Sequence, residues 1–326
     1  MNIIIGKDIF FMEETCMRER EKSRYTGLVL FCLFTLLLFI LLLVIGSFYD
    51  ENIATSLYNP GTFIKYVTSI GAFPFFAFAV LFTGAIYERI LHSEMGKPKR
   101  ITLCTICCIV ATFVGFIGAG TLVDKDSLGS IFPELNRNIP VILGISVISV
   151  PLLIRLGFNL AKKSEETGLI KRIVCLLILL VLAFVLLQVF KNTFHRPRFR
   201  LVMEGHEEIG FIPWYKSFDD YQLMIDKYGI DVGEFRSFPS GHSILSISLV
   251  VILQSLSWFS TKLKDKKILL GVAGLLFAVI IMFTRLVLGA HYVSDISAGA
   301  IIGSVLAIIY TVIENAIDKS EKRKQS

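Results

Sequence analysis

The sequence predicts an all-α protein, a polytopic bundle of about eight transmembrane helices. The first observation is composition: 54% of the 326 residues are hydrophobic and only 18% are charged, with a mean hydropathy of +0.68. The second is length, because the apolar runs are each close to the ~20 residues that a helix needs to cross a bilayer. The third is charge, because Lys and Arg gather in short clusters between the runs, as membrane topology requires.

Eight apolar runs follow a polar, mixed-charge N-terminal segment. The expected helices cover residues 27–48, 66–88, 102–122, 139–160, 171–190, 241–259, 268–289 and 296–315. The fourth run, with Pro140 and Pro151, and the last two, with their glycines and polar residues, are the weakest matches to a spanning helix. The six cysteines, including those of the Cys104-Thr-Ile-Cys107-Cys108 group, fit packing better than metal or redox chemistry.

The basic clusters predict orientation. An eight-helix arrangement with both termini in the cytoplasm places the clusters in the tails and in the second, fourth and sixth loops on the cytoplasmic side. The long fifth loop, about 192–239, is basic but lies outside in this arrangement. Long loops are translocated across the membrane largely regardless of their charge. We therefore expect a multi-pass protein of the cell membrane that contacts the lipid bilayer and does not bind nucleic acid. The sequence does not indicate an oligomeric state.

The stretch from Thr284 to Asp295 places charged residues at a seam between two apolar runs. Charges near a bilayer centre cost about 2.5–3.5 kcal/mol each on insertion scales, so charged residues at such positions usually have a functional or structural role. His291 and Asp295 are four residues apart and would share one face of a helix. With Arg285, the pair could attack or bind a phosphate. The alternative is a charge cluster that anchors two helix ends.

A second motif, Pro239-Ser240-Gly241-His242, stands directly before an apolar run. Ser240 occupies an N-cap position, and Gly241 would let a ligand approach the backbone amides of the helix start, which favour an anion. His242 would lie in the first turn. The alternative is an ordinary helix start with an incidental histidine.

A third group follows the fifth run, where Lys191, Arg196 and Arg198 could neutralise phosphoryl oxygens. Interfacial snorkelling explains a single basic residue there but explains three cations poorly. Three ordered groups at helix ends thus converge on the predicted outer face.

Together these motifs resemble those of the type 2 phosphatidic-acid phosphatase superfamily. Its pattern is Lys, six residues and Arg-Pro; then Pro-Ser-Gly-His; then Ser-Arg, five residues, His, three residues and Asp. Phe199 stands where the first motif has Pro, and Thr284 replaces Ser in the third. The resemblance covers about 171–316 and implies a six-helix-type membrane core, so the four leading helices exceed that core by about two.

The resemblance implies an organisation and a mechanism. The expected parts are an N-terminal cytoplasmic tail at 1–26, leading transmembrane helices of unassigned role at 27–160, a phosphatase core at 161–316 that includes the extracytoplasmic loop 192–239, and a basic cytoplasmic tail at 317–326. The implied catalytic residues are His291 as nucleophile, Asp295 as the residue that orients it, and His242 as the acid. The implied phosphate ligands are Lys191, Arg198, Arg285 and the amides near Ser240 and Gly241.

The resemblance thus implies a membrane lipid phosphatase that needs no metal or other cofactor. Phosphatidic acid, phosphatidylglycerophosphate and undecaprenyl diphosphate are all suitable substrates, and the additional Arg196 and Arg200 favour a diphosphate slightly. His195 and Arg196 are candidate auxiliary ligands. One alternative is a lipid phosphotransferase that forms a phosphohistidine and passes the phosphoryl group to another acceptor instead of water. The other is a non-catalytic lipid-phosphate binding or transport protein. A cation site at Glu204, His206, Glu207 and Glu208 is the weaker interpretation of those loop residues.

Overall fold

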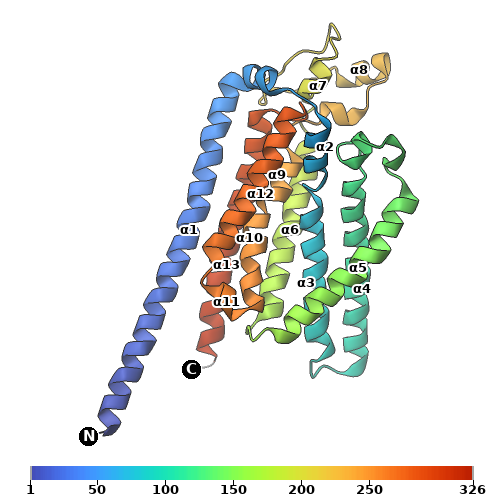
Figure 1. Ribbon diagram of the computed structural model, residues 1–326. Helices are drawn as coiled ribbons and strands as arrows, with labels where there is room; N and C mark the ends of the chain where they lie inside the picture. The colour runs from blue at the N-terminus through green and yellow to red at the C-terminus, as the bar shows by residue number, and fades with distance from the viewer. Residues whose placement is uncertain (1, 325–326) are drawn as a thin grey trace.

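The computed structural model describes residues 2–324 and confirms the all-α membrane bundle (Figure 1). Within that range there is no β-strand, and eight helical segments are long and apolar enough to cross a membrane. The two chain ends lie at the same end of the bundle, whereas α2, α7 and α8 gather at the opposite end (Figure 1). This arrangement is the one expected of an even number of spans.

Helix α1 runs without interruption from Asn2 to Leu57. The helix expected at 27–48 is therefore longer at both ends, because the polar segment continues the same helix, and the cytoplasmic location of residues 1–26 stays a prediction. The physical reason is that Glu, Arg, Lys and Met favour helix, and no proline occurs before Pro60. Helix α1 packs along α13 at the edge of the bundle (Figure 1).

The second predicted span is divided into α2, Thr62–Ser69, and α3, Phe73–Leu91. Proline in the first turn of α3 cannot donate a helical hydrogen bond, so a helix start is favoured there. Between the two helices, a Cβ on Gly71 would come within 3.0 Å of His242 Cδ2. The break therefore lets the chain approach a predicted catalytic histidine closely.

The other spans match the predicted runs to within about five residues, except that the sixth is broken and the last continues as a helix to Arg323, eight residues beyond its predicted end. They are α4 (Lys97–Leu122), α5 (Ile139–Lys163), α6 (Leu169–Lys191), α12 (Lys267–Val287) and α13 (Val293–Arg323). The sixth consists of α9 (Gly241–Ile247), α10 (Leu249–Ser255) and the 3₁₀ turn η4 (Leu256–Phe259). Asn138 caps α5 by accepting a hydrogen bond from the amide of Val141 at 3.2 Å.

Short helices order the connections. The loop 192–239 contains α7 (Phe199–Val202), α8 (Tyr221–Tyr228) and η3 (Val232–Phe235). The turns η1 (Leu128–Ser130) and η2 (Pro133–Leu135) lie between α4 and α5, and α11 (Thr261–Lys264) precedes α12. The long fifth loop is thus ordered by three short helical segments.

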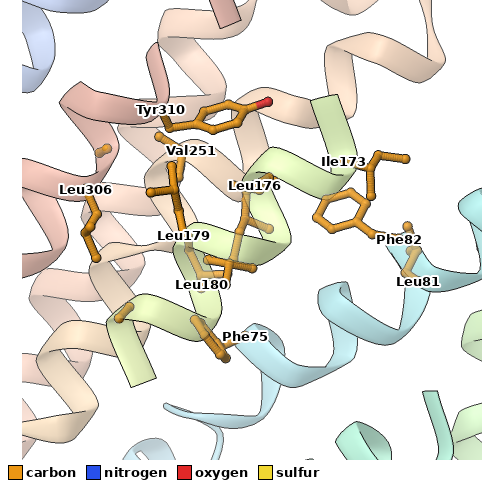
Figure 2. Packing of buried hydrophobic residues seen from close by; sticks show 14 of the residues in the cluster. Phe75, Leu81, Phe82, Ile173, Leu176, Leu179, Leu180, Val251, Leu306 and Tyr310 are labelled. Carbon is orange, nitrogen blue, oxygen red and sulfur yellow. The ribbon is translucent and has the colours of Figure 1, made fainter. Parts of the chain in front are cut away.

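Helix α6 lies at the centre of the apolar core (Figure 2). Its Leu176 and Leu180 are buried together with Phe75 and Phe82 of α3 and with Tyr310 of α13. Helix α6 also contacts α9, whereas α4 and α5 pack against α3 on the far side from α1 (Figure 1). This core fixes the ends of α6, α9, α12 and α13 relative to one another.

Candidate active site

Four helix ends meet at one end of the bundle. Lys191 is the last residue of α6 and Gly241 is the first residue of α9. Arg285 lies in the last turn of α12, and Asp295 lies in the first turn of α13. Because α6 and α12 arrive at the end from which α9 and α13 depart, motifs separated by up to about a hundred positions come together.

These residues surround a cavity of about 330 Å³. Six of the eight predicted catalytic and phosphate-binding residues line it, namely Lys191, Arg198, Gly241, His242, Arg285 and His291. Ser240 and Asp295 are fully buried and do not line it. The structure therefore gathers the three sequence motifs around one space and places two of their residues behind it.

His291 lies in the turn between α12 and α13, not on a helix. Its Nδ1 is 2.7 Å from the carbonyl oxygen of Ser237, whereas the closest Asp295 oxygen is 3.8 Å away. The prediction that His291 lies on a helix is therefore wrong, whereas its pairing with Asp295 is retained at 3.8 Å and Ser237 supplies the closer hydrogen bond that holds the ring. A carbonyl only accepts, so Nδ1 carries the proton and Nε2 keeps its lone pair.

The environment of His291 favours the neutral imidazole. The side chain is 1% exposed. Burial lowers its pKa to about 3, and the charges of Arg285 and Arg198 act in the same direction. A neutral ring with a free nitrogen lone pair is the form that can act as a nucleophile.

Asp295 supports the turn in which His291 lies. One carboxylate oxygen accepts hydrogen bonds from the hydroxyl of Ser237 at 2.5 Å and from the amide of Tyr292 at 2.8 Å. The other oxygen lies 2.5 Å from Arg196 Nη1. Asp295 thus binds both flanks of the histidine, Ser237 and Tyr292, and orients it through the backbone as well as by its charge.

Arg198 and Arg285 keep unused hydrogen-bond donors. The Nε atoms of both guanidinium groups are buried and have no partner among the described residues. The third cation, Lys191, lies close to the helix start, since a Cβ on Gly241 would be 3.4 Å from its Nζ. Unpaired buried donors are costly, so the cavity favours an anion that could fill them.

The start of α9 presents His242 to the cavity. Ser240 caps the helix by accepting from the amide of Ser243 at 3.4 Å. Its own amide donates to the carbonyl oxygen of Asp295 at 3.0 Å, so the predicted phosphate contact from the Ser240 amide is not available. His242 Nε2 is buried and without a partner in the described part of the chain, which leaves it free to exchange a proton with a ligand.

A comparison with protein families assigns the segment that carries this geometry. Residues 172–318 match the model of the PAP2 superfamily. This segment belongs to the PAP2 superfamily. All three motifs, from Lys191 to Asp295, lie within the match. No curated protein and no solved structure matches the chain. The protein thus combines eight helices long and apolar enough to cross a membrane with a segment that matches a superfamily of phosphatases.

Arg196, which the sequence suggests as an auxiliary phosphate ligand, does not line the cavity. Its guanidinium is fully buried and binds Asp295, Asp50, the hydroxyl of Ser294 and the carbonyl of Ile212. It also lies 4.0 Å from the ring centroid of Tyr292. Because its donors are used in this way behind the cavity, the structure contradicts the auxiliary role and indicates a positioning role.

The other polar candidates in the loop also have local partners. The ring of His195 stacks on Tyr221, with centroids 3.7 Å apart, and does not line the cavity. Glu208 binds Lys227 and the hydroxyl of Tyr228. Among residues 2–324, no group of three metal-ligating side chains is brought together there. The structure therefore gives no support to a cation site in this loop.

The two departures from the family motif cause no visible disruption. Phe199 is buried between Tyr58 and Tyr292, with which it makes edge-to-face contacts. The hydroxyl of Thr284 donates to the carbonyl of Ile281 at 2.7 Å and lies 3.0 Å from the hydroxyl of Thr68. Both substitutions therefore contribute to packing around the PAP2 segment.

The leading helices supply polar residues that sequence reasoning missed. Asp50 of α1 binds Arg196 and accepts from the amide of Ser294 at 2.9 Å. Asp126, between α4 and α5, contacts Arg198 and Arg285. An acidic residue near the end of a spanning helix was a signal for Asp50, whereas Asp126 lies in a polar loop that carried no comparable signal.

Proposed function

We propose that the protein hydrolyses the phosphate ester or diphosphate of a membrane lipid through a phosphohistidine intermediate, without a metal. The observation that carries the proposal is the convergence of two histidines and three cations on one cavity at the helix ends. Simple binding of an anion needs the cations, but it does not need a neutral histidine with a free lone pair beside a second, unpartnered histidine.

In the first step, Nε2 of His291 attacks phosphorus and the bond to the leaving oxygen breaks. The proton on Nδ1 stays on the hydrogen bond to Ser237, and the nearby Asp295 stabilises the positive ring. His242, which takes up a proton when the anionic phosphate enters the cavity, gives that proton to the leaving alkoxide or phosphate oxygen. Lys191, together with the unused donors of the two arginines, stabilises the charge on the equatorial oxygens.

In the second step, water attacks the phosphorus of the phosphohistidine. His242, now neutral, accepts a proton from that water, and the P–N bond breaks. Inorganic phosphate leaves, and both histidines return to their starting protonation states. The same site can therefore act as acid in one step and base in the next.

The position of the cavity favours a lipid substrate. It lies where α6 and α12 end and α9 and α13 begin, so a phosphate can reach it while the lipid tail remains among apolar helices. Phosphatidic acid, phosphatidylglycerophosphate and undecaprenyl diphosphate all meet this requirement. We further propose that this end faces the extracytoplasmic side of the cell membrane and that both termini are cytoplasmic, because the basic clusters lie at the opposite end.

Phosphate release from a panel of lipid mono- and diphosphates tests the proposal. Purified protein in detergent should release phosphate from at least one lipid, and excess EDTA should not reduce the rate. His291→Ala should abolish release while thermal unfolding stays cooperative. His195→Ala is the matched control, because this neighbouring histidine lies outside the cavity, and it should retain activity.

Two outcomes would contradict the proposal. Release that appears only when an alcohol or sugar acceptor is added would identify a phosphotransferase. Absence of release from every lipid by the folded wild-type protein, with or without acceptors, would indicate a binding or transport protein.

A further inference from the structure

Asp126 places a carboxylate directly on the cations of the candidate phosphate site. One oxygen lies 2.6 Å from Arg198 Nη1 and 3.0 Å from Arg285 Nη2, and the other lies 2.8 Å from Arg200 Nη2. Two of these arginines belong to the family motifs. The carboxylate therefore occupies donors that a phosphate would use.

The loop that carries Asp126 is fixed to the fifth loop by a second set of ion pairs. Lys125 Nζ lies 2.8 Å from Asp231 and 3.1 Å from Glu234. Glu234 in turn lies 2.7 Å from Arg200, which binds Asp126 as well. The loop between α4 and α5, residues 123–138, thus forms one wall of the cavity and is held there electrostatically.

Asp126 remains ionised in this position. Burial alone would raise its pKa, but Arg198, Arg285 and Arg200 hold the pKa well below its ordinary value. An ionised carboxylate and a phosphate make the same kind of charge-assisted hydrogen bond to arginine. They therefore compete for the same donors.

The contact leaves part of each arginine unused. Asp126 engages terminal guanidinium nitrogens, whereas Nε of Arg198 and Nε of Arg285 have no partner in the described range. A terminal phosphate carries three oxygens and up to two charges, so it can fill more donors than one carboxylate. A phosphodiester, with two free oxygens and one charge, gains less by replacing the carboxylate.

We propose that Asp126 is an internal competitor that the terminal phosphate of the substrate displaces, and that it thereby raises the intrinsic affinity that any anion needs in order to occupy the site. The inference rests on the proposed function only in that the cavity receives phosphate. Competition reduces the apparent affinity of every anion by the same factor. Weakly bound phosphodiester headgroups, abundant around a membrane enzyme, are then excluded first, while terminal phosphates still bind.

The test compares two single-charge variants of the same loop. The probe is inorganic phosphate, titrated calorimetrically into the full-length protein in detergent. Asp126→Asn should tighten the phosphate Kd by about tenfold, which corresponds to removal of one competing state that holds most of the population. Asp124→Asn is the matched control: Asp124 lines the same cavity, but within residues 2–324 its carboxylate accepts only from the amide of Asp126 and forms no ion pair with the arginines.

An equal effect of both variants would show that net charge, not displacement, controls binding, and would overturn the proposal. An unchanged or weaker phosphate Kd in Asp126→Asn would also overturn it, because Asp126 would then position the arginines rather than compete with the ligand.

Wild-type protein provides a measurement that does not depend on the variant folding. Saturating phosphate should increase amide hydrogen exchange in residues 123–138, because the displaced loop loses its contacts with the arginines. Unchanged or slower exchange would contradict displacement. Phosphate binding needs no turnover, so the two proposals can fail separately. If Asp126→Asn binds phosphate more tightly but the wild-type protein releases phosphate from no lipid, the proposed function is refuted and this inference stands.

Discussion

The two ends of the bundle both bury charged residues, but they differ in how fully the buried cations are paired with carboxylates. At the end away from the candidate site, Arg172 contacts Glu166, Asp318 and Glu314. Glu314 also accepts from Lys267 at 2.6 Å. Cations and carboxylates there face one another directly, and the cluster lines a cavity of about 960 Å³.

At the candidate active site, cations are in excess. Asp126 and Glu234 are the acids that contact the arginines, whereas Lys191, Arg198, Arg200, Arg236 and Arg285 supply positive charge. Three of the arginine Nε atoms, together with His242 Nε2, lack partners within residues 2–324. The buried cations of the larger cavity are thus paired with carboxylates, whereas the smaller cavity keeps cation donors without a partner in the described residues. Unused donors, rather than volume, distinguish a site built for an anion.

The largest effect that separates the two ends should come from removing a charge where cations and carboxylates are paired. Arg172→Met leaves the buried Glu314 and the half-buried Glu166 and Asp318 without their shared cation, so we expect it to lower the free energy of unfolding by about 2–4 kcal/mol. Activity per folded molecule should stay near that of the wild type. Denaturant unfolding in detergent, followed by an assay of the folded fraction, checks both; a loss of kcat without a loss of stability would erase the distinction.

The same substitution at the other end should have the opposite profile. Arg198→Met removes a donor from the phosphate cavity and should lower kcat by roughly 10²–10³. Stability should change little, because positive charge is in excess there and Asp126 keeps two other arginines. Steady-state kinetics and thermal unfolding of this variant, read beside those of Arg172→Met, sharpen the comparison. Strong destabilisation by Arg198→Met would contradict it.

Asp50→Asn tests a third, intermediate case, the paired network directly behind the site. Asp50 binds Arg196 and the amide of Ser294, so we expect a loss of about 1–3 kcal/mol of stability from the weakened buried hydrogen bonds. Because Arg196 holds Asp295, kcat should fall while KM stays nearly constant. Asp50→Ala should be worse on both measures; a changed KM alone would instead place Asp50 in contact with the substrate.

The smallest effect concerns pH. Burial lowers the pKa of His291 to about 3, whereas an unfolded histidine titrates near about 6.5. Between these values the unfolded state binds more protons, so stability falls as pH falls below about 6.5, by at most about 1.4 kcal/mol per pH unit. Unfolding measured from pH 7.5 to 5 should show a shallower slope for His291→Gln, and an equal slope would show that His291 is not held neutral.

The fold and the motif residues could be predicted because their signals are local in sequence. Apolar runs of sufficient length give the helices, and the short motifs at their ends give Lys191, His242 and His291. The break near Gly71 was missed because it depends on tertiary packing against His242. A run of residues that could continue a helix does not reveal what it must pack against.

The contacts of the arginines could not be predicted for a related reason. Arg196 and Arg198 are two positions apart, yet one is enclosed by Asp50 and Asp295 and the other faces the cavity. Their partners come from distant parts of the chain, and Asp126 is 72 positions from Arg198. Spacing identifies a cation, but only the fold decides whether its partner is a substrate or another side chain.

The most direct test of the central claim is to trap the phosphorylated enzyme. Wild-type protein is mixed with a lipid whose terminal phosphate is radiolabelled, quenched in alkali, and analysed for protein-bound label that acid removes, as expected of a phosphoramidate. We predict label on the peptide that contains His291 and none in His291→Ala. Turnover without any bound label, or label that persists in His291→Ala, would contradict the account.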